Sequence, residues 1–406
     1  MNTEPTVLVV GGGATGAGIA RDLALRGVDV LLVERGGLGT GTTGRSHGLL
    51  HSGARYAEAD ATGARECLTE NRVLQDIAGA CVRETGGLFV RLENDDPDYF
   101  EAKLRACREV DIPTERLDAD TARERVPDLS DAVVEAFEVP DGTIFPSRLV
   151  AANAADAAEN GATIRTQTPV EGIDVTDGKV DGVRLGGQTE TTVNPTCVVN
   201  ATGAWAGKIA DMAGLRLEMA PSRGVMVAVE YDGLGPVLNR CREPSDGDII
   251  VPHRQTAVVG TTSVPVTDPD GYDTAEWEVE RAIEECAAMV PAVAEATEHR
   301  RWWGVRPLYA PDEAGTDRRG ISRGFTLLDH GRESIANFYS VVGGKLTTYR
   351  EMAEVTADRV CEQLGVDEPC LTASERLPGA DDPERLDRFV DRYGGPNPAD
   401  AEGHSD

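Results

Sequence analysis

The chain has 406 residues, of which 40% are hydrophobic, so it is long enough for two domains and has the composition of a globular α/β protein. Its 70 acidic residues outnumber the 40 basic ones and give a formal net charge of −30. So large a negative charge excludes nucleic acid and anionic lipid as partners, because both would be repelled.

Lysine is rare among the basic residues and occurs only at positions 103, 179, 208 and 345. An acid-rich, lysine-poor composition is typical of halophilic proteins from salt-accumulating microbes, so the charge indicates where the protein works rather than what it does. The amino-terminal MNTEPTVLVV has no signal-peptide pattern, and no apolar run reaches the roughly 20 residues of a membrane helix. We therefore expect a cytoplasmic protein without a membrane span, reaching the inner face of the cell membrane only through partners.

The first predicted elements form a β-α-β unit. Residues 6–10 are an apolar run that ends in glycines, residues 14–25 have helical periodicity, and residues 28–33 predict a second strand that ends at Glu34. A carboxylate in this place is suited to accept hydrogen bonds from the hydroxyls of a ribose.

The turn after the first strand has the spacing G-x-G-x-x-G at Gly11, Gly13 and Gly16. The first glycine permits the tight turn, the second lets the backbone approach a pyrophosphate, and the third lets the helix pack closely on the strand. The free N–H groups at the start of the helix favour a bound phosphate. Together with the strand, helix and acidic residue in register, this spacing predicts a dinucleotide site.

Further along the chain, the pattern predicts strands, helices and one large antiparallel sheet. Expected helices cover 62–80, parts of 98–125, 149–159, 274–290 and 347–364, with one short helix after Gly379; expected strands cover 84–92, 162–165, 196–201 and 338–342, and the sheet covers 216–265. The final segment, 394–406, is expected to be a disordered tail. The eight Cys residues show no metal spacing, so we expect buried thiols and no metal site.

Three further segments favour FAD over NAD as the dinucleotide. One strand ends in small residues at 201–204, another meets Gly343 and Gly344 before a helix, and the loop at 39–44 is rich in Gly and Thr. Small residues at a strand end leave room for a cofactor, and the second helix could donate to a flavin carbonyl. Segments so widely spaced along the chain suit an elongated FAD.

The strings GGGATGAGIARDLALRGVDVLLVER and TGTTGRSHGLLHSGARYA closely resemble the FAD-dependent glycerol-3-phosphate dehydrogenase family, most of all the catalytic component of the anaerobic enzyme, its A subunit. The strings NRCREPSDGDIIVP, VVGTTS, WGVRPL, SRGFTLLDH and GGKLTTYREMAE continue the similarity in family order, over about residues 5–378. The resemblance implies oxidation of sn-glycerol 3-phosphate to dihydroxyacetone phosphate, with FAD as hydride acceptor.

The implied fold is α/β: a Rossmann-like FAD-binding domain of the D-amino-acid oxidase/glutathione-reductase-2 type with a smaller mixed-sheet substrate domain. We assign 1–80, 145–215 and 325–366 to the FAD-binding domain, 81–144 and 216–324 to the substrate domain, and 367–406 to a partly disordered carboxyl-terminal extension. The cofactor contacts expected from the fingerprint and the resemblance are Gly11, Gly13, Ala14, Thr15, Gly16, Glu34, Arg35, Thr42, Thr43, Arg45, Ser46, Gly48, Leu50, Val170, Ala201, Thr202, Gly203, Gly343, Gly344, Lys345, Leu346 and Thr347.

Recognition of a phosphate dianion requires cations, preferably Arg, whose planar fork matches a phosphate. The family motifs provide Arg55, Arg306, Arg323 and Lys345 for this site. Removal of the hydroxyl proton requires a base, for which the resemblance implies His51.

Other groups are alternative bases or are expected to shape the substrate pocket. His253 is the second choice of base, while Lys345 or a bound water could also take the proton. Tyr56 and Thr262 are expected to shape the pocket.

The resemblance also implies B and C partner subunits that pass electrons to the quinone pool. Members of the family usually continue into a cysteine-bearing domain after the GGKLTTYR helix. The 406 residues contain no such cysteines, so we expect either a short form or different partner contacts.

Three other functions remain open on the sequence alone. One is an FAD-dependent 2-hydroxy acid dehydrogenase or oxidase, against which the Arg306 and Arg323 motifs and GGKLTTYR argue. Another is a catalytically silent flavoprotein subunit, which the joint presence of the candidate residues disfavours. The last is NAD-linked chemistry, which the scattered strand–glycine junctions disfavour.

Overall fold

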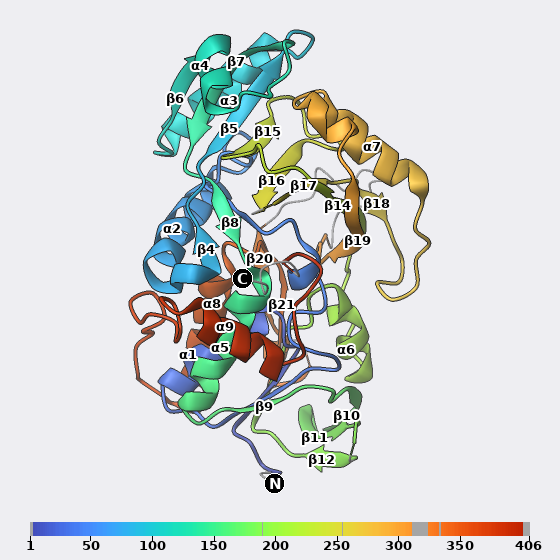
Figure 1. The fold of residues 1–406 in the computed structure, drawn as a ribbon. Coiled ribbons are helices and arrows are strands. Elements are labelled where there is room, and N and C mark those ends of the chain that lie inside the picture. The colour runs from blue at the N-terminus through green and yellow to red at the C-terminus, as the bar shows by residue number, and fades with distance from the viewer. Residues whose placement is uncertain (1–2, 189, 254, 311–323, 333, 401–406) are drawn as a thin grey trace.

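The structure is a computed structural model that describes residues 3–188, 190–253, 255–310, 324–332 and 334–400. Two large sheets organise the chain, and they lie one above the other in Figure 1. The lower sheet contains the amino-terminal β-α-β unit, and the upper one carries α7 (Glu276–Ala287) on its side.

The lower sheet has six strands in the order β20-β21-β13-β1-β2-β9. Its centre is parallel, since β1 pairs in parallel with both β13 and β2, and only β20 runs antiparallel at the edge. The predicted strands are confirmed: β1 (Val7–Val10), β2 (Val30–Val33), β9 (Thr163–Arg165), β13 (Cys197–Asn200) and β21 (Phe338–Gly343), joined by β20 (Phe325–Asp329).

Both faces of this sheet are covered, as the continuous apolar runs require. Val7 and Val9 point into a core shared with helices on one face, whereas Leu8 and Val10 point into a second core on the other. The helical face carries α1 (Ala14–Leu25), α5 (Pro146–Glu159) and α8 (Tyr349–Leu364); the opposite face carries α6 (Ala206–Met212) and a small sheet of β10 (Val170–Thr176), β11 (Lys179–Leu185) and β12 (Thr191–Val193). The carboxyl ends of β1, β2, β13 and β21 therefore meet at one edge, where open α/β sheets bind ligands.

The upper sheet has nine strands, eight of them in the order β18-β14-β17-β16-β15-β5-β7-β6, with β19 paired to β14. The antiparallel sheet predicted over 216–265 is confirmed, and β15 joins it to the 87–139 segment by pairing in parallel with β5. The strands are β5 (Gly87–Leu92), β6 (Glu115–Asp118), β7 (Val133–Val139), β14 (Ser222–Glu230), β15 (Val237–Arg240), β16 (Ile249–His253), β17 (Thr256–Gly260), β18 (Val264–Pro265) and β19 (Glu298–Arg306), with α3 (Pro97–Glu109) and α4 (Ala119–Arg125) beside them.

A third, short sheet connects the two parts. It consists of β3 (Leu49–Leu50), β8 (Gly142–Ile144) and β4 (Val82–Arg83), and α2 (Ala61–Ala78) packs next to it. The segment from residue 49 to 56 begins in this sheet and contacts both large parts, since His51 N donates to Thr347 Oγ1 after β21 and Arg55 Nη2 donates to Asp248 Oδ2 before β16. The division of the chain into domains with the boundaries given above stays a prediction.

The prediction of a disordered tail is wrong for residues 394–400, which the structure describes. The short helix after Gly379 is present as α9 (Pro383–Arg392), which packs on α5, and the following residues to 400 continue along the same surface. Asn397, Ala399 and Asp400 are buried, and the Asp400 carboxylate accepts hydrogen bonds from Ser147 N (2.8 Å) and Ser147 Oγ (2.6 Å). A polar, glycine-rich segment is ordered here because its side chains satisfy buried groups at the start of α5.

Replacement of Asp400 by Ala is expected to lower the free energy of unfolding by about 1–3 kcal/mol, since both Ser147 donors would lose their partner in a buried place. Urea denaturation at high KCl measures this change. Asp391→Ala, at an exposed position of α9, is the matched control and should leave the midpoint unchanged. An unchanged midpoint for Asp400→Ala would show that this segment does not stabilise the fold.

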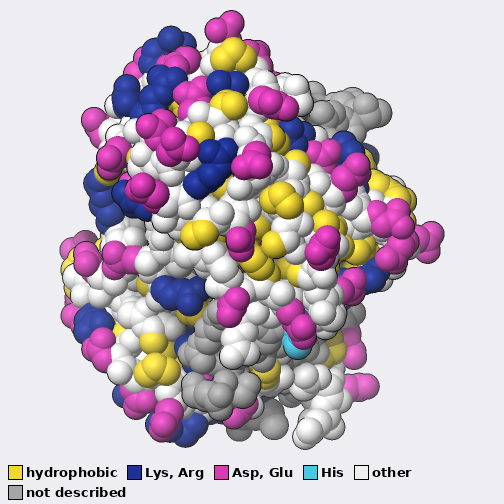
Figure 2. All heavy atoms as spheres, turned by 45° about the horizontal axis from the view of Figure 1, so that its top comes forward, with side chains coloured by type: hydrophobic (Ala, Val, Ile, Leu, Met, Phe, Trp, Pro, Cys, Tyr) yellow, Lys and Arg dark blue, Asp and Glu magenta, His cyan; other side chains and the backbone are white. Residues whose placement is uncertain are grey.

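The surface matches the composition. Figure 2 shows acidic side chains across the whole visible face, interspersed with Lys and Arg groups. Over the described part of the chain, no helix is both long enough and apolar enough to cross a membrane.

Candidate functional site

A cavity of about 680 Å³ opens at the carboxyl edge of the lower sheet, a size suited to a bound cofactor. The ends of β1, β2, β13 and β21 all contribute to its wall, so segments far apart in sequence meet there. Of the predicted cofactor residues, those that line it are Gly11, Gly13, Ala14, Thr15, Glu34, Arg35, Thr42, Thr43, Arg45, Ser46, Val170, Ala201, Thr202, Gly203, Gly343, Gly344, Lys345 and Leu346.

The glycine turn has the geometry that its spacing predicts. Gly11 has φ +106°, and a Cβ there would lie 2.7 Å from the carbonyl oxygen of Ala201. A Cβ on Gly16 would lie 1.9 Å from the carbonyl oxygen of Gly11, so α1 can pack this close to β1 only without a side chain. Gly13, by contrast, would meet only Thr43 Oγ1, at 3.2 Å, and its backbone faces the cavity.

The start of α1 fits a phosphate group. Gly13 caps this helix without a side-chain hydrogen bond, and no acidic residue lies in the first turn. Ala14 N donates to Thr43 Oγ1 (3.2 Å), which brings the Gly/Thr loop to the helix start. The positive end of the helix dipole is therefore not neutralised by an acid of its own and faces the cavity, as a pyrophosphate requires.

The second strand ends at a well-held carboxylate. Glu34 Oε2 accepts from Gly12 N (2.8 Å) and Glu34 Oε1 accepts from Gly36 N (2.9 Å), so the side chain is fixed in the cavity wall. A carboxylate has about four acceptor positions, and the two backbone donors leave capacity for ribose hydroxyls. The residues present thus fit the dinucleotide that the sequence predicts.

A segment of the upper part closes one side of the cavity, and the sequence did not predict it. Pro269, Asp270 and Tyr272, between β18 and α7, belong to the wall. Burial alone would raise the pKa of Asp270. Hydrogen bonds from Arg35, Lys208 and the Trp205 indole outweigh this effect and lower the pKa of Asp270 to about 2.

The predicted base lies in a compact polar cluster. His51 Nε2 is 3.4 Å from the Tyr56 hydroxyl, and Lys345 Nζ lies 4.8 Å from the centroid of the Tyr56 ring. His51 N donates to Thr347 Oγ1 (3.0 Å), which ties the 49–56 segment to the loop after β21. Of these residues, Lys345 lines the cavity, so the cluster adjoins it.

The charges of two predicted arginines act on buried His47. Burial, followed by the positive charges of Arg306 and Arg55, lowers the pKa of His47 to about 3, so this imidazole is neutral near pH 7. Arg306 Nη2 donates to Thr261 Oγ1 (3.1 Å) and to the Thr262 carbonyl (3.0 Å), just after β17. The Arg306 side chain does not line the cavity itself, although Val305 and Pro307 on either side of it do.

The remaining predicted residues are placed as follows. Four predicted cofactor residues do not line the cavity: Gly16, Gly48, Leu50 and Thr347. The first three pack against neighbouring groups, and Thr347 Oγ1 accepts a hydrogen bond from His51 N. Thr262 is buried and donates to Glu278 Oε1 (2.8 Å), and His253 Nε2 lies 3.3 Å from the His47 carbonyl oxygen. Arg323 lies outside the described residues.

Sequence reasoning missed several wall residues. Trp205 and Lys208 follow the strand that ends in small residues, and the rarity of lysine was a signal that could have drawn attention to Lys208. His47 is not part of the wall; it lies within TGTTGRSHGLLHSGARYA, and nothing in that string predicts its burial or the effect of Arg306 and Arg55 on its charge. Asp270 and Tyr272 carry no local signal at all.

Comparison with known proteins agrees with this geometry. The family model for FAD dependent oxidoreductases matches residues 6–359. The A1 subunit of the anaerobic glycerol-3-phosphate dehydrogenase of Haloferax volcanii is 51% identical over 97% of this chain and 70% of its own length. The corresponding polypeptide of the Escherichia coli K12 enzyme is 46% identical, over 94% of this chain and 71% of its own.

A solved structure shows the same fold with the cofactor in place. The glycerol-3-phosphate dehydrogenase of Bacillus halodurans, complexed with FAD, superposes with a TM-score of 0.71 at 26% identity, over 96% of this chain and 71% of that one. With the matched model and both relatives, this shows that the chain belongs to the FAD-dependent oxidoreductase family and, within it, to the A subunits of the anaerobic glycerol-3-phosphate dehydrogenases.

Proposed function

We propose that this chain oxidises sn-glycerol 3-phosphate to dihydroxyacetone phosphate, with bound FAD supplying the hydride acceptor. Two relatives that bear the name of this dehydrogenase match over 97% and 94% of the chain, which supports the reaction. The residues that would hold FAD are those of the cavity wall, from the glycine turn to Gly344.

The observation that carries the proposal is the gathering of cations beside the cavity. Lys345 lies in its wall, 4.8 Å from the ring centroid of Tyr56, which follows Arg55 in the chain, and Arg306 lies between the wall residues Val305 and Pro307. In a chain with a net charge of −30, cations so placed favour an anionic ligand. Two guanidinium forks and an ammonium group suit a phosphate dianion. Arg323 remains a further proposed ligand.

The roles of the individual groups follow from their positions. Arg306 and Arg55 bind and orient the phosphate, with Thr261 and Thr262 holding the Arg306 guanidinium. His51 accepts the proton of the substrate hydroxyl, with Tyr56 orienting its ring through the 3.4 Å contact; Lys345 or a bound water is the alternative acceptor.

We also propose that the chain works with partners. As the A component of such an enzyme it would pass electrons through B and C subunits to the quinone pool, working in the cytoplasm at the inner face of the cell membrane. Co-purification from a salt-adapted host tests this, and recovery of the free chain alone would contradict it.

Anaerobic titration with glycerol 3-phosphate at high salt tests the reaction directly. We expect the flavin absorbance of the purified protein to bleach near one equivalent of substrate. A yellow protein that 2-hydroxy acids bleach instead would move the assignment to that substrate class. A flavin that no substrate bleaches would indicate a silent subunit.

A further inference from the structure

Arg55 contacts a buried carboxylate whose role the sequence pattern did not predict. Its Nη2 lies 3.4 Å from Oδ2 of Asp248, a residue just before β16. The Asp248 side chain is 1% exposed and that of Arg55 is 21% exposed. Among the described residues, this is the one side-chain partner of the Arg55 guanidinium, whose other N–H groups can therefore meet a ligand.

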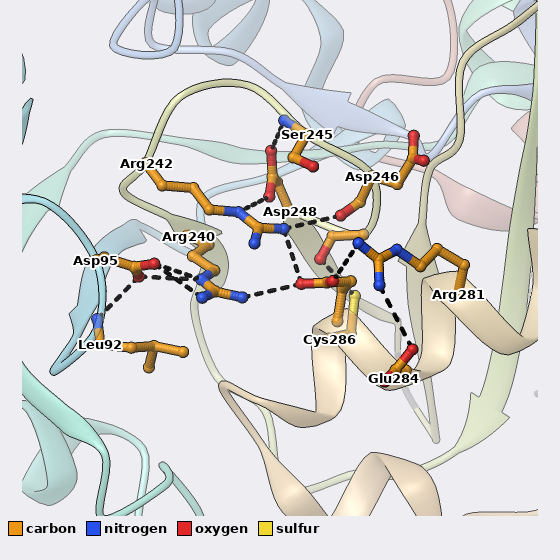
Figure 3. Close-up of polar contacts among 12 residues, drawn as sticks. Leu92, Asp95, Arg240, Arg242, Ser245, Asp246, Asp248, Arg281, Glu284 and Cys286 are labelled. Atoms are coloured by element: carbon orange, nitrogen blue, oxygen red, sulfur yellow. Dashed lines mark hydrogen bonds and ion pairs between the residues drawn. The ribbon is translucent and has the colours of Figure 1, made fainter.

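Asp248 is itself fixed by several donors, as Figure 3 shows. Its Oδ1 accepts from Arg242 Nε (2.8 Å) and its Oδ2 accepts from Ser245 N (2.6 Å). The Asp248 carbonyl also accepts from Arg240 N (2.9 Å), which anchors its backbone to β15. A carboxylate with so many partners has one orientation, so it gives Arg55 a rigid reference point.

A wider set of ion pairs keeps this reference point in place. Glu285, on α7, binds Arg242 Nη2 (2.9 Å) and Arg240 Nη1 (3.0 Å), and Arg240 Nη2 in turn binds Asp95 (2.8 Å). These residues come from β15 and the loop after it, from α7 and from the turn after β5, and all are largely buried. Within the described part of the chain, the ion pairs of Glu285 go to arginines other than Arg55, so Glu285 belongs to the same network without touching the proposed ligand site.

The backbone of Arg55 is held from the other side. Lys103, on α3, donates to the Arg55 carbonyl (3.2 Å) and pairs with Glu58 (2.6 Å) while almost fully buried. Arg55 is thus fixed at its backbone by α3 and at its guanidinium by the residue before β16. Few rotamers remain open to the side chain, which reduces the entropy lost when it binds an anion.

From these contacts we propose that Asp248 is a positioning residue that orients the Arg55 guanidinium toward the phosphate of the substrate. The inference rests on the proposed function and deepens it. Asp248 touches neither the substrate nor the cofactor in this arrangement, and its effect is carried by Arg55. Because the 3.4 Å contact is long and engages one N–H group, Arg55 keeps the donors that a phosphate needs.

The test is Asp248→Asn, which keeps the shape of the side chain and an oxygen for Ser245 N but removes the charge. We expect KM for glycerol 3-phosphate to rise about tenfold while kcat changes about twofold or less, since the lost orientation affects binding of the phosphate. Competitive inhibition by inorganic phosphate should weaken in parallel. The control is Glu243→Gln, which removes a carboxylate charge at an exposed position of the same loop, outside the ion-pair network, and should leave KM unchanged.

A double-mutant cycle separates positioning from a general structural effect. In an Arg55→Ala background, Asp248→Asn should leave KM unchanged, because its partner is already absent. An equal rise in KM for Asp248→Asn and Glu243→Gln, or a full effect without Arg55, would overturn the role of Asp248. Failure of the wild-type flavin to be reduced by glycerol 3-phosphate would overturn the proposed function as well, so the two failures are distinct.

Discussion

A protein with Gly16 replaced by Ala is expected to purify without its yellow colour. The added Cβ would lie 1.9 Å from the Gly11 carbonyl oxygen, which belongs to the backbone of the turn and cannot swing aside. Either α1 moves away from β1 or the turn opens, and both displace the N–H groups that face the phosphates. We expect FAD affinity to fall by about 100-fold or more, on the basis of an overpacking cost of about 3 kcal/mol.

The visible spectrum and the flavin content per chain measure this loss. Gly235→Ala is a suitable control, because a Cβ at Gly235 meets nothing within 4 Å and its φ is not positive. Gly13→Ala should give an intermediate result, since its Cβ would meet only the Thr43 hydroxyl at 3.2 Å. Full flavin content in Gly16→Ala would show that the cofactor does not depend on the close approach of α1 to β1.

The parts of the fold that the sequence predicts are those governed by local pattern. The β1-α1-β2 unit could be predicted because apolar runs, helical periodicity and a fixed glycine spacing all occur within about thirty residues of one another. The ends of β13 and β21 could be linked to the same cofactor because small residues stand at both. These features can be predicted from local sequence alone, without knowing which distant residues pack against them.

The parts that could not be predicted depend on contacts between distant segments. Asp270 reaches the cavity from the segment between β18 and α7, and only the fold places it beside Arg35 and Lys208. His47 is a neutral imidazole because burial, and after it the positive charges of Arg306 on β19 and of Arg55 on a separate loop, lower its pKa. The segment at 394–400 has the composition of a tail, yet its polar groups satisfy buried partners in α5.

Replacing Arg306 by Ala should weaken substrate binding strongly, by about 2–4 kcal/mol if the phosphate pair is desolvated. That energy corresponds to a rise in KM of roughly 30- to 1000-fold. The structure adds a second expected effect: Thr262 O and Arg223 O would each lose a guanidinium donor, at 3.0 and 3.4 Å, so some stability should be lost as well.

Steady-state kinetics of Arg306→Ala and Arg306→Lys, beside their unfolding midpoints, separate the two effects. Lys keeps the charge but lacks the fork whose Nη1 donates to Arg223 O and whose Nη2 donates to Thr262 O, so its KM should lie between those of the wild type and the Ala variant. Loss of a nearby cation should also raise the pKa of His47 from its low value, which NMR titration can follow. A stable Ala variant with unchanged KM would show that Arg306 does not bind the substrate and only hydrogen-bonds Thr261 and Thr262 after β17.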